Sequence, residues 1–208
     1  MYQEIKLISK RNEVFRIVEE GKSYILKRFT DQKDMKREIE ILELLNNKGI
    51  KVPLILGMKE NALFLEDLGT NTLLEWYETQ EKKKLLSYGE MLRKLLEWIK
   101  QFYSVTSEYY EEQMILTDIN FRNFILKDEE IYGIDFEQVQ PGRIEVDAGK
   151  IVAFALTYEP VMTKWKWCFC NEFIEIFSTE FNMNKDFILK ERDFELKEME
   201  KRRGARFL

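Results

Sequence analysis

Residues 114–126 read MILTDINFRNFIL, and residues 131–139 read IYGIDFEQV; these two stretches decide the fold. Each places polar side chains directly after a short apolar run. Such runs are typical of short buried strands, so the polar residues beyond them stand at strand ends. Asp118 and Asn123 are five residues apart in the first stretch, and Asp135 ends the apolar run of the second. The pattern predicts one cleft edge that gathers carboxylate and amide oxygens.

An oxygen-rich edge of this kind suits phosphoryl transfer from ATP, which needs ligands for Mg²⁺ and a carboxylate at the acceptor hydroxyl. We interpret Asp118 as the catalytic base that accepts the hydroxyl proton, and Asn123 and Asp135 as the metal ligands. The chain contains no histidine, which excludes histidine bases and histidine-ligated zinc or iron. Any catalysis must therefore use carboxylates, lysine, hydroxyls or a metal ion held by oxygen.

The cation that phosphoryl transfer needs is found upstream. Lys27 lies in SYILKRF, late in a predicted strand, where it could point into a cleft and meet phosphates. Eleven residues on, Glu38 lies near the apolar stripe of a helix predicted over 33–48, where it could pair with Lys27. Glu40 and Glu43 are the alternatives for this role. Taken singly, each of these residues also fits an ordinary solvent-exposed position.

The chain is rich in strands first and rich in helices second. The first seventy residues read β-β-α-β-β. From Leu73 to about Phe102 the pattern is helical, with charged residues among the apolar positions Leu85, Leu92, Leu95, Leu96 and Ile99. Everything after Asp147 reads as helix. We therefore predict an α+β, two-lobed protein with a cleft between the lobes. Residues 1–68 would form a small β-rich N-lobe that binds nucleotide, and residues 69–208 a mainly helical C-lobe with the catalytic and metal-binding loops.

Five motifs carry a resemblance to the eukaryotic-like kinase superfamily, and within it to the aminoglycoside and choline phosphotransferase branch. YILK resembles the VAIK lysine motif, and LFLEDLG resembles the hinge strand LLLEDLG of that branch. TDINFRN resembles HGDLHxxN, and GIDFE resembles the metal-binding IDFE or IDWE. VDAGKIVAF resembles the segment whose aspartate, here Asp147, supports the catalytic loop. The match covers residues 5 to 160, with a weaker likeness to the small kinase of the KEOPS tRNA-modification complex and to RIO kinases.

The resemblance implies a protein-kinase-like fold that uses ATP and Mg²⁺. It places Asp118, Asn123 and Asp135 in the roles given above, and Asp147 in a structural one. The residues that it places around the nucleotide are Lys27 and Glu38 at the phosphates, Ser9 and Asn12 in the nucleotide loop, and the backbone of Glu66, Asp67 and Leu68 at adenine.

Two departures from the family pattern leave room for a slow kinase or for a nucleotide-binding pseudokinase that acts as an interaction module. Leu116-Thr117 replaces the usual His-Gly before Asp118, and the nucleotide loop ISKRNEVF has no glycine to approach the phosphates closely. Only twelve residues separate Asp135 from Asp147, which excludes a long activation loop. That favours a small-molecule acceptor over a protein, although a small serine/threonine kinase or ATPase of the KEOPS or RIO type is the alternative.

The net charge and the hydropathy of the sequence limit the classes of partner that we expect. The net charge is −5, which argues against nucleic-acid binding except through a complex that contacts the basic tail KRRGAR. No apolar run approaches the roughly 18 residues of a membrane span, so we expect a cytoplasmic protein without a membrane partner. Cys168 and Cys170 are interpreted as core residues. Trp165 and Trp167 fit the core better than an acceptor pocket.

Overall fold

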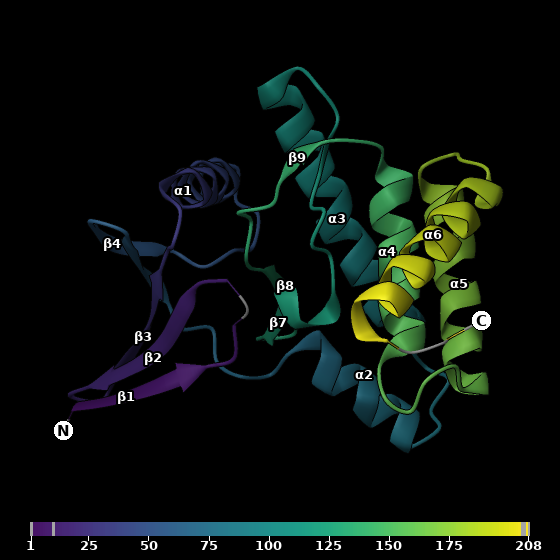
Figure 1. The fold of residues 1–208 in the computed structure, drawn as a ribbon, viewed down its shortest axis with the longest axis horizontal. Coiled ribbons are helices and arrows are strands. Elements are labelled where there is room, and N and C mark those ends of the chain that lie inside the picture. Colours follow the sequence, from purple (N-terminus) through teal and green to yellow (C-terminus); the bar gives the residue numbers. More distant parts are fainter. Residues whose placement is uncertain (1, 10, 205–206, 208) are drawn as a thin grey trace.

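The computed structural model describes residues 2–9, 11–204 and 207. An antiparallel sheet with one helix forms the N-terminal lobe, and a group of helices with two short strand pairs forms the C-terminal lobe (Figure 1). The α+β, two-lobed architecture predicted from the sequence is therefore confirmed. None of the helices within the described residues has the length and apolar character of a membrane span.

The N-lobe sheet has five antiparallel strands in the order β1-β2-β3-β5-β4. They are β1 (Tyr2–Leu7), β2 (Glu13–Glu19), β3 (Lys22–Arg28), β4 (Ile55–Lys59) and β5 (Ala62–Glu66). The observed order β-β-β-α-β-β has one more strand than the predicted β-β-α-β-β. The additional strand is β1, which pairs with β2 in a register from Tyr2↔Glu19 to Leu7↔Val14. This edge strand is almost wholly exposed, so it alternates charged and apolar residues and lacks the apolar run by which the other strands were found.

Helix α1 (Gln32–Asn47) follows β3 and precedes β4 in the chain, and it lies beside the strands of the N-lobe (Figure 1). It starts at Asp31, whose side chain accepts a hydrogen bond from the Lys33 N–H. Its apolar face shares one buried core with Leu63 and Leu65 of β5. Glu38 lies on that same buried face, because the sequence places it one turn before Leu42.

The helical pattern from Leu73 to about Phe102 forms two helices. Helix α2 (Leu73–Lys82) begins with a capping box between Thr72 and Glu75, and α3 (Gly89–Tyr110) follows a six-residue connection. Lys84 in that connection has a positive φ of 55°, which ends the helix. Leu85, counted as part of the apolar stripe, is 43% exposed and packs on no core face.

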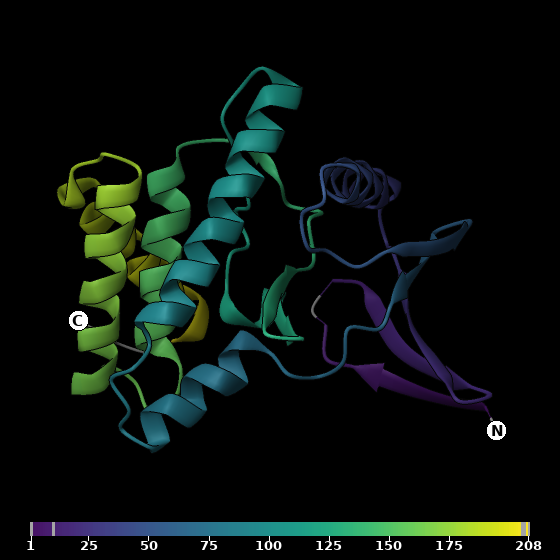
Figure 2. The same ribbon diagram turned by 180° about the vertical axis from the view of Figure 1, so that it is seen from behind.

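The C-lobe joins two short strand pairs to a helical bundle. Strand β6 (Met114–Ile115) pairs with β9 (Gln140–Pro141), and β7 (Phe124–Lys127) pairs with β8 (Glu130–Gly133). A turn of 3-10 helix, η1 (Phe121–Asn123), precedes β7. The remaining helices are α4 (Ile144–Thr157), α5 (Lys164–Glu180) and α6 (Lys185–Arg203). Seen from behind, α3 runs across the face of α4 and α5 (Figure 2).

The cysteines and tryptophans of α5 are mainly structural. Cys170 is buried whereas Cys168 is exposed, so the core interpretation holds for Cys170 alone. Trp165 is buried against Phe169, with which it stacks at 5.7 Å between ring centroids. Trp167 is half-buried.

Candidate active site where the two lobes meet

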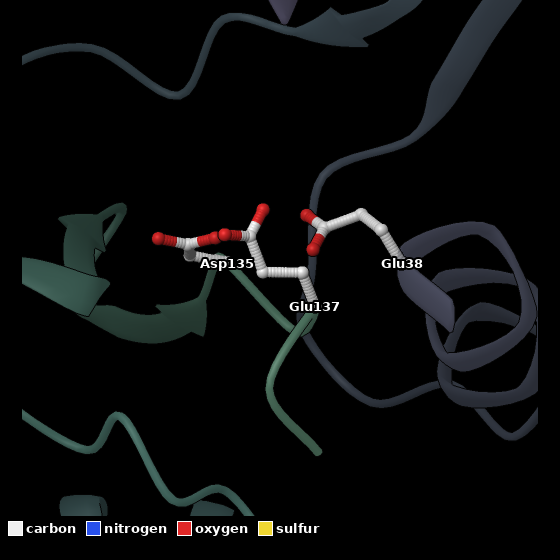
Figure 3. A group of neighbouring side chains, drawn as sticks. All are labelled: Glu38, Asp135 and Glu137. Atoms are coloured by element: carbon white, nitrogen blue, oxygen red, sulfur yellow. The ribbon is translucent and has the colours of Figure 1, made fainter. Parts of the chain in front are cut away.

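Lys27 of β3 lies at the centre of a cluster of charges drawn from both lobes. Its Nζ is 2.6 Å from Asp135 Oδ1, 3.0 Å from Glu137 Oε2 and 3.5 Å from Glu38 Oε2. The three carboxylates point toward one another, Glu38 from α1 and the other two from the segment after β8 (Figure 3). One oxygen from each lies within 4.8 Å of the others. One ammonium group therefore faces three carboxylates.

Burial shapes the charge state of this cluster. Burial raises the pKa of Glu38 to about 7, against the attraction of Lys27, and it raises the pKa of Glu137 as well. For Lys27, burial alone lowers the pKa, but the three neighbouring carboxylates outweigh it and leave the pKa above its ordinary value. With three carboxyl groups for one ammonium group, the cluster carries surplus negative charge once the carboxyl groups are ionised. A set of hard oxygen ligands with surplus negative charge fits a divalent cation such as Mg²⁺.

Backbone hydrogen bonds hold the segment that carries Asp135. The Phe136 N–H donates to Glu38 Oε2 at 2.6 Å, and the Ile134 N–H donates to the Asn123 carbonyl at 2.9 Å. Gly133 lies directly under Trp98, where an added Cβ would be 2.2 Å from a ring carbon. Asp135 itself has a φ of +68°, a strained conformation for a residue with a side chain. The fold therefore fixes Asp135 beside Asn123 at one end of the β7–β8 hairpin.

The predicted nucleotide loop contributes one residue to the cluster. Asn12 is buried; its Nδ2 donates to Glu137 Oε2 at 2.5 Å, and its Oδ1 accepts from the Thr30 N–H at 3.2 Å. Ser9 is exposed, and its side chain makes no hydrogen bond with the described part of the chain. The loop thus reaches the acidic residues through an amide instead of a glycine backbone.

The loop that carries Asp118 is open to solvent. Asp118 is exposed, and its Oδ1 accepts a hydrogen bond from Asn120 Nδ2 at 3.1 Å. Asn123 Nδ2 donates to the Asp118 carbonyl at 2.8 Å. This bond uses an N–H group of the amide and not its oxygen, which is the atom that a metal would use.

Asp147 anchors that loop from below. It is fully buried at the start of α4, and it accepts hydrogen bonds from the N–H groups of Leu116 at 2.7 Å and Thr117 at 2.9 Å. The Tyr103 hydroxyl donates to it at 2.9 Å. Burial raises the pKa of Asp147 to about 6, while these three donors lower it. Thr117 has a φ of +65°, so a threonine takes the conformation for which a glycine stands in the family pattern.

The chain segment between the lobes is held by charged side chains. Arg16 of β2 donates to Asp67 at 2.7 and 2.9 Å and to the Gly69 carbonyl at 2.9 Å. The N–H of Glu66 is already bonded to the Leu54 carbonyl at 2.9 Å, so it is not free for adenine. Of the three residues predicted to meet adenine, Asp67 and the buried Leu68 form no backbone–backbone hydrogen bond with the described residues.

The structure thus brings together Lys27, Glu38, Asp135 and, through Glu137, Asn12. It leaves Ser9 apart from them and uses the Asp67 side chain as a structural ion-pair partner. Sequence reasoning missed Glu137, although it stands two residues after Asp135 in the quoted GIDFE. It also missed Arg16 and Tyr103, whose partners lie 51 and 44 residues away with no local signal.

Comparisons with known proteins agree with this geometry. Residues 2–146 match the family described as RIO domain. No curated protein matches the chain. Among solved structures, the crystal structure of the aminoglycoside phosphotransferase APH(4)-Ia is similar with a TM-score of 0.64, covering 89% of this chain and 81% of that one at 10% identity. At such low identity the likeness concerns the fold, which is protein-kinase-like as the motifs implied.

Proposed function

Because this chain belongs to the RIO-domain family of protein-kinase-like proteins, we propose that it transfers the γ-phosphoryl group of Mg-ATP to a hydroxyl group of a small molecule. One observation carries the proposal. The Lys27 Nζ of the N-lobe lies within 3.5 Å of three carboxylates. One belongs to Glu38 of the N-lobe, and the other two belong to Asp135 and Glu137 of the C-lobe. The exposed carboxylate of Asp118 stands on the neighbouring loop.

The buried cluster would serve the nucleotide. Lys27 binds phosphate oxygens, and Glu38 keeps its ammonium group in place. Asp135 and Asn123 are the ligands for Mg²⁺, and Glu137 adds a third oxygen donor that the sequence analysis did not include. When bound, the metal neutralises charge that develops on the transferred group. The backbone at Asp67 and Leu68 is the edge that adenine would meet.

The exposed loop would serve the acceptor. Asp118 takes the proton of the acceptor hydroxyl as the hydroxyl oxygen forms its bond to the γ-phosphorus and the bond to ADP breaks. Asp147 keeps the loop in place through its bonds to two backbone N–H groups. The connection from Asp135 to the start of α4 at Ile144 contains only the short strand β9 and irregular segments, so it offers no long platform for a protein substrate. That shortness supports a small acceptor.

Family membership favours a second candidate, a protein kinase or ATPase of the RIO type. In that case the γ-phosphoryl group passes to a serine or threonine of a protein, or to water. The same residues would act in the same roles. Only the destination of the phosphate separates the two candidates.

The first experiment measures nucleotide binding by thermal shift. ATP with Mg²⁺ should raise the melting temperature of the purified protein, and ATP with a chelator should raise it much less. Asp135→Ala should lose the Mg²⁺-dependent part while remaining folded. Asp186→Ala, an exposed aspartate on α6, is the matched control and should behave like the wild type. An Asp135→Ala variant with an unchanged Mg²⁺-dependent shift would contradict the metal assignment.

The second experiment follows the label of [γ-³²P]ATP. Label on small metabolites supports the first candidate, and label on protein or in free phosphate supports the second. Asp118→Ala should keep the thermal shift with Mg-ATP but lower transfer by roughly 10²–10⁴-fold. Full transfer by this variant would show that Asp118 is not the base.

A further inference from the structure

Three cationic side chains gather around the loop that carries Asp118, although the chain as a whole has a net charge of −5. They are Arg122 of the loop itself, Lys150 of α4 and Arg203 at the end of α6. Arg122 and Arg203 are exposed and Lys150 is half-buried, and in the described part of the chain none of the three forms an ion pair with a carboxylate. The nucleotide roles proposed above use none of them.

Tyr158 locates the two arginines relative to the proposed base. The Arg122 guanidinium lies over the Tyr158 ring, 5.3 Å from its centroid, and Arg203 donates to the carbonyl of Thr157 at 3.5 Å. Burial raises the pKa of the Tyr158 hydroxyl to about 12; Arg122 and Arg203 lower it and Asp118 raises it. The Tyr158 hydroxyl also accepts a hydrogen bond from the Phe121 N–H at 3.1 Å, so Tyr158 and its two arginine neighbours lie against the loop that carries Asp118. The end of α6 accordingly lies beside the end of α4 (Figure 1).

Lys150 adds a third positive charge at the base of the loop. Its Nζ donates to the Thr117 carbonyl at 2.7 Å, which uses one of its three N–H groups. The Thr117 hydroxyl, next to it, is a buried oxygen without a hydrogen-bond partner in the described residues. The loop therefore presents positive charge and an unused polar group beside Asp118.

The chemistry of the guanidinium group limits the class of ligand that can bind here. A guanidinium presents a planar fork of N–H donors that matches phosphate oxygens in a bidentate manner, and it stays charged at any physiological pH. Two such groups from different elements fit one doubly charged phosphate. The nucleotide already has its own cation in Lys27 and its own carboxylates for a metal. The arginines are therefore available for the acceptor.

Building on the proposed phosphotransferase function, we propose that the acceptor is a small hydroxyl compound that already carries a phosphate group, and that Arg122 and Arg203 bind this phosphate beside Asp118. The bound phosphate holds the acceptor, so that its hydroxyl reaches the carboxylate of Asp118. Lys150 contributes positive charge at longer range. The product would then be a compound with two phosphate groups.

The test measures binding of glycerol 2-phosphate and of glycerol to the full chain. The protein is first saturated with Mg²⁺ and a nonhydrolysable ATP analogue, which occupies the nucleotide phosphate positions. Each probe is then titrated and followed by calorimetry. We expect saturable binding of glycerol 2-phosphate below about 10 mM and none of glycerol. Arg122→Gln/Arg203→Gln should weaken the phosphate probe at least tenfold and leave the affinity for the analogue unchanged.

The control is Lys83→Gln/Lys84→Gln, which removes two positive charges from the exposed α2–α3 connection and should bind like the wild type. Equal binding of the two probes, or undiminished binding by the arginine variant, would overturn the proposal. Loss of analogue affinity in that variant would assign the arginines to the nucleotide and would also overturn it. If the analogue itself does not bind the wild type, the proposed function fails first, so the two failures are distinguishable.

Discussion

The Lys27 cluster and the Asp118 loop, which we propose to form one site, differ in burial, charge and support. The cluster is buried, contains one cation for three carboxylates, and joins β3, α1 and the segment after β8. The loop is exposed at Asp118, is surrounded by unpaired cations, and depends on one buried carboxylate, Asp147, beneath it. We interpret the Lys27 cluster as a preformed nucleotide site and the Asp118 loop as an acceptor site that stays open to solvent.

The largest effect is expected from Lys27→Met. It removes the cation and leaves three carboxylates together, which should lower the free energy of unfolding by about 3–5 kcal/mol at pH 7. Without Lys27 the carboxyl groups hold their protons more tightly in the folded than in the unfolded protein. The loss should therefore shrink as the pH falls from 7 to 5. Urea denaturation at both pH values checks this.

The matched control for that variant is Lys22→Met, an exposed lysine at the start of the same strand. It should change the free energy of unfolding by less than about 0.5 kcal/mol. Equal midpoints for the two variants would show that the cluster does not need its cation. Adding Glu137→Gln to Lys27→Met should recover part of the lost stability, because it removes one of the repelling charges.

Asp147→Asn should produce the next largest effect, and it acts on the open region. The amide turns one acceptor oxygen into a donor that faces backbone N–H groups, at a cost of about 1.5–3 kcal/mol. Label transfer from ATP should fall further than stability, because the loop loses its anchor. Tyr103→Phe removes one donor and keeps both backbone bonds, so it should retain most transfer. If Asp147→Asn leaves label transfer unchanged, the loop that carries Asp118 does not depend on Asp147 for its position.

A smaller effect is expected from Asn12→Ala, at about 1–2 kcal/mol in urea denaturation. It removes the hydrogen bond to Glu137 and leaves the Thr30 N–H without its partner. Mg-ATP should bind this variant more weakly. Ser9→Ala in the same loop is the control and should change neither quantity, because Ser9 is exposed. A loss as large in Ser9→Ala would show that the loop acts through its backbone alone.

The smallest effect on stability is expected from Asp118→Asn, which alters an exposed carboxylate and should stay within about 0.5 kcal/mol of the wild type. This contrast with Lys27→Met sharpens the comparison most. A large loss of stability in Asp118→Asn would show that the Asp118 side chain also stabilises the fold. The proposed difference between the Lys27 cluster and the Asp118 loop would then be wrong.

The spacing of short motifs predicted more of this structure than the periodicity of its apolar residues did. Lys27, Glu38 and Asp135 were placed in one site from their order along the chain, and their charged groups do meet; their chemical roles stay predictions. Periodicity did not separate α2 from α3, because Leu85 fits an apolar stripe that it does not occupy. Strand β1 escaped notice because an exposed edge strand has no apolar run.

The contacts that sequence could not supply connect distant parts of the chain. Asn12 and Glu137 are 125 residues apart, and Arg16 and Asp67 are 51 apart. Such pairs leave no local pattern, because their partners are chosen by the packing of the lobes. Glu137 differs from these, since it lies only two residues from Asp135 in the quoted GIDFE.

The hydrogen bond between Glu38 and the Phe136 N–H bears on how this protein is controlled. Rotating α1 outward would leave the buried carboxylate and the buried N–H without partners and would also break the ion pair with Lys27. Each such loss costs about 1–3 kcal/mol or more. An on–off mechanism that swings this helix would have to supply that energy on every cycle. For the phosphotransferase that we propose, these contacts favour a helix α1 that stays in place throughout the reaction.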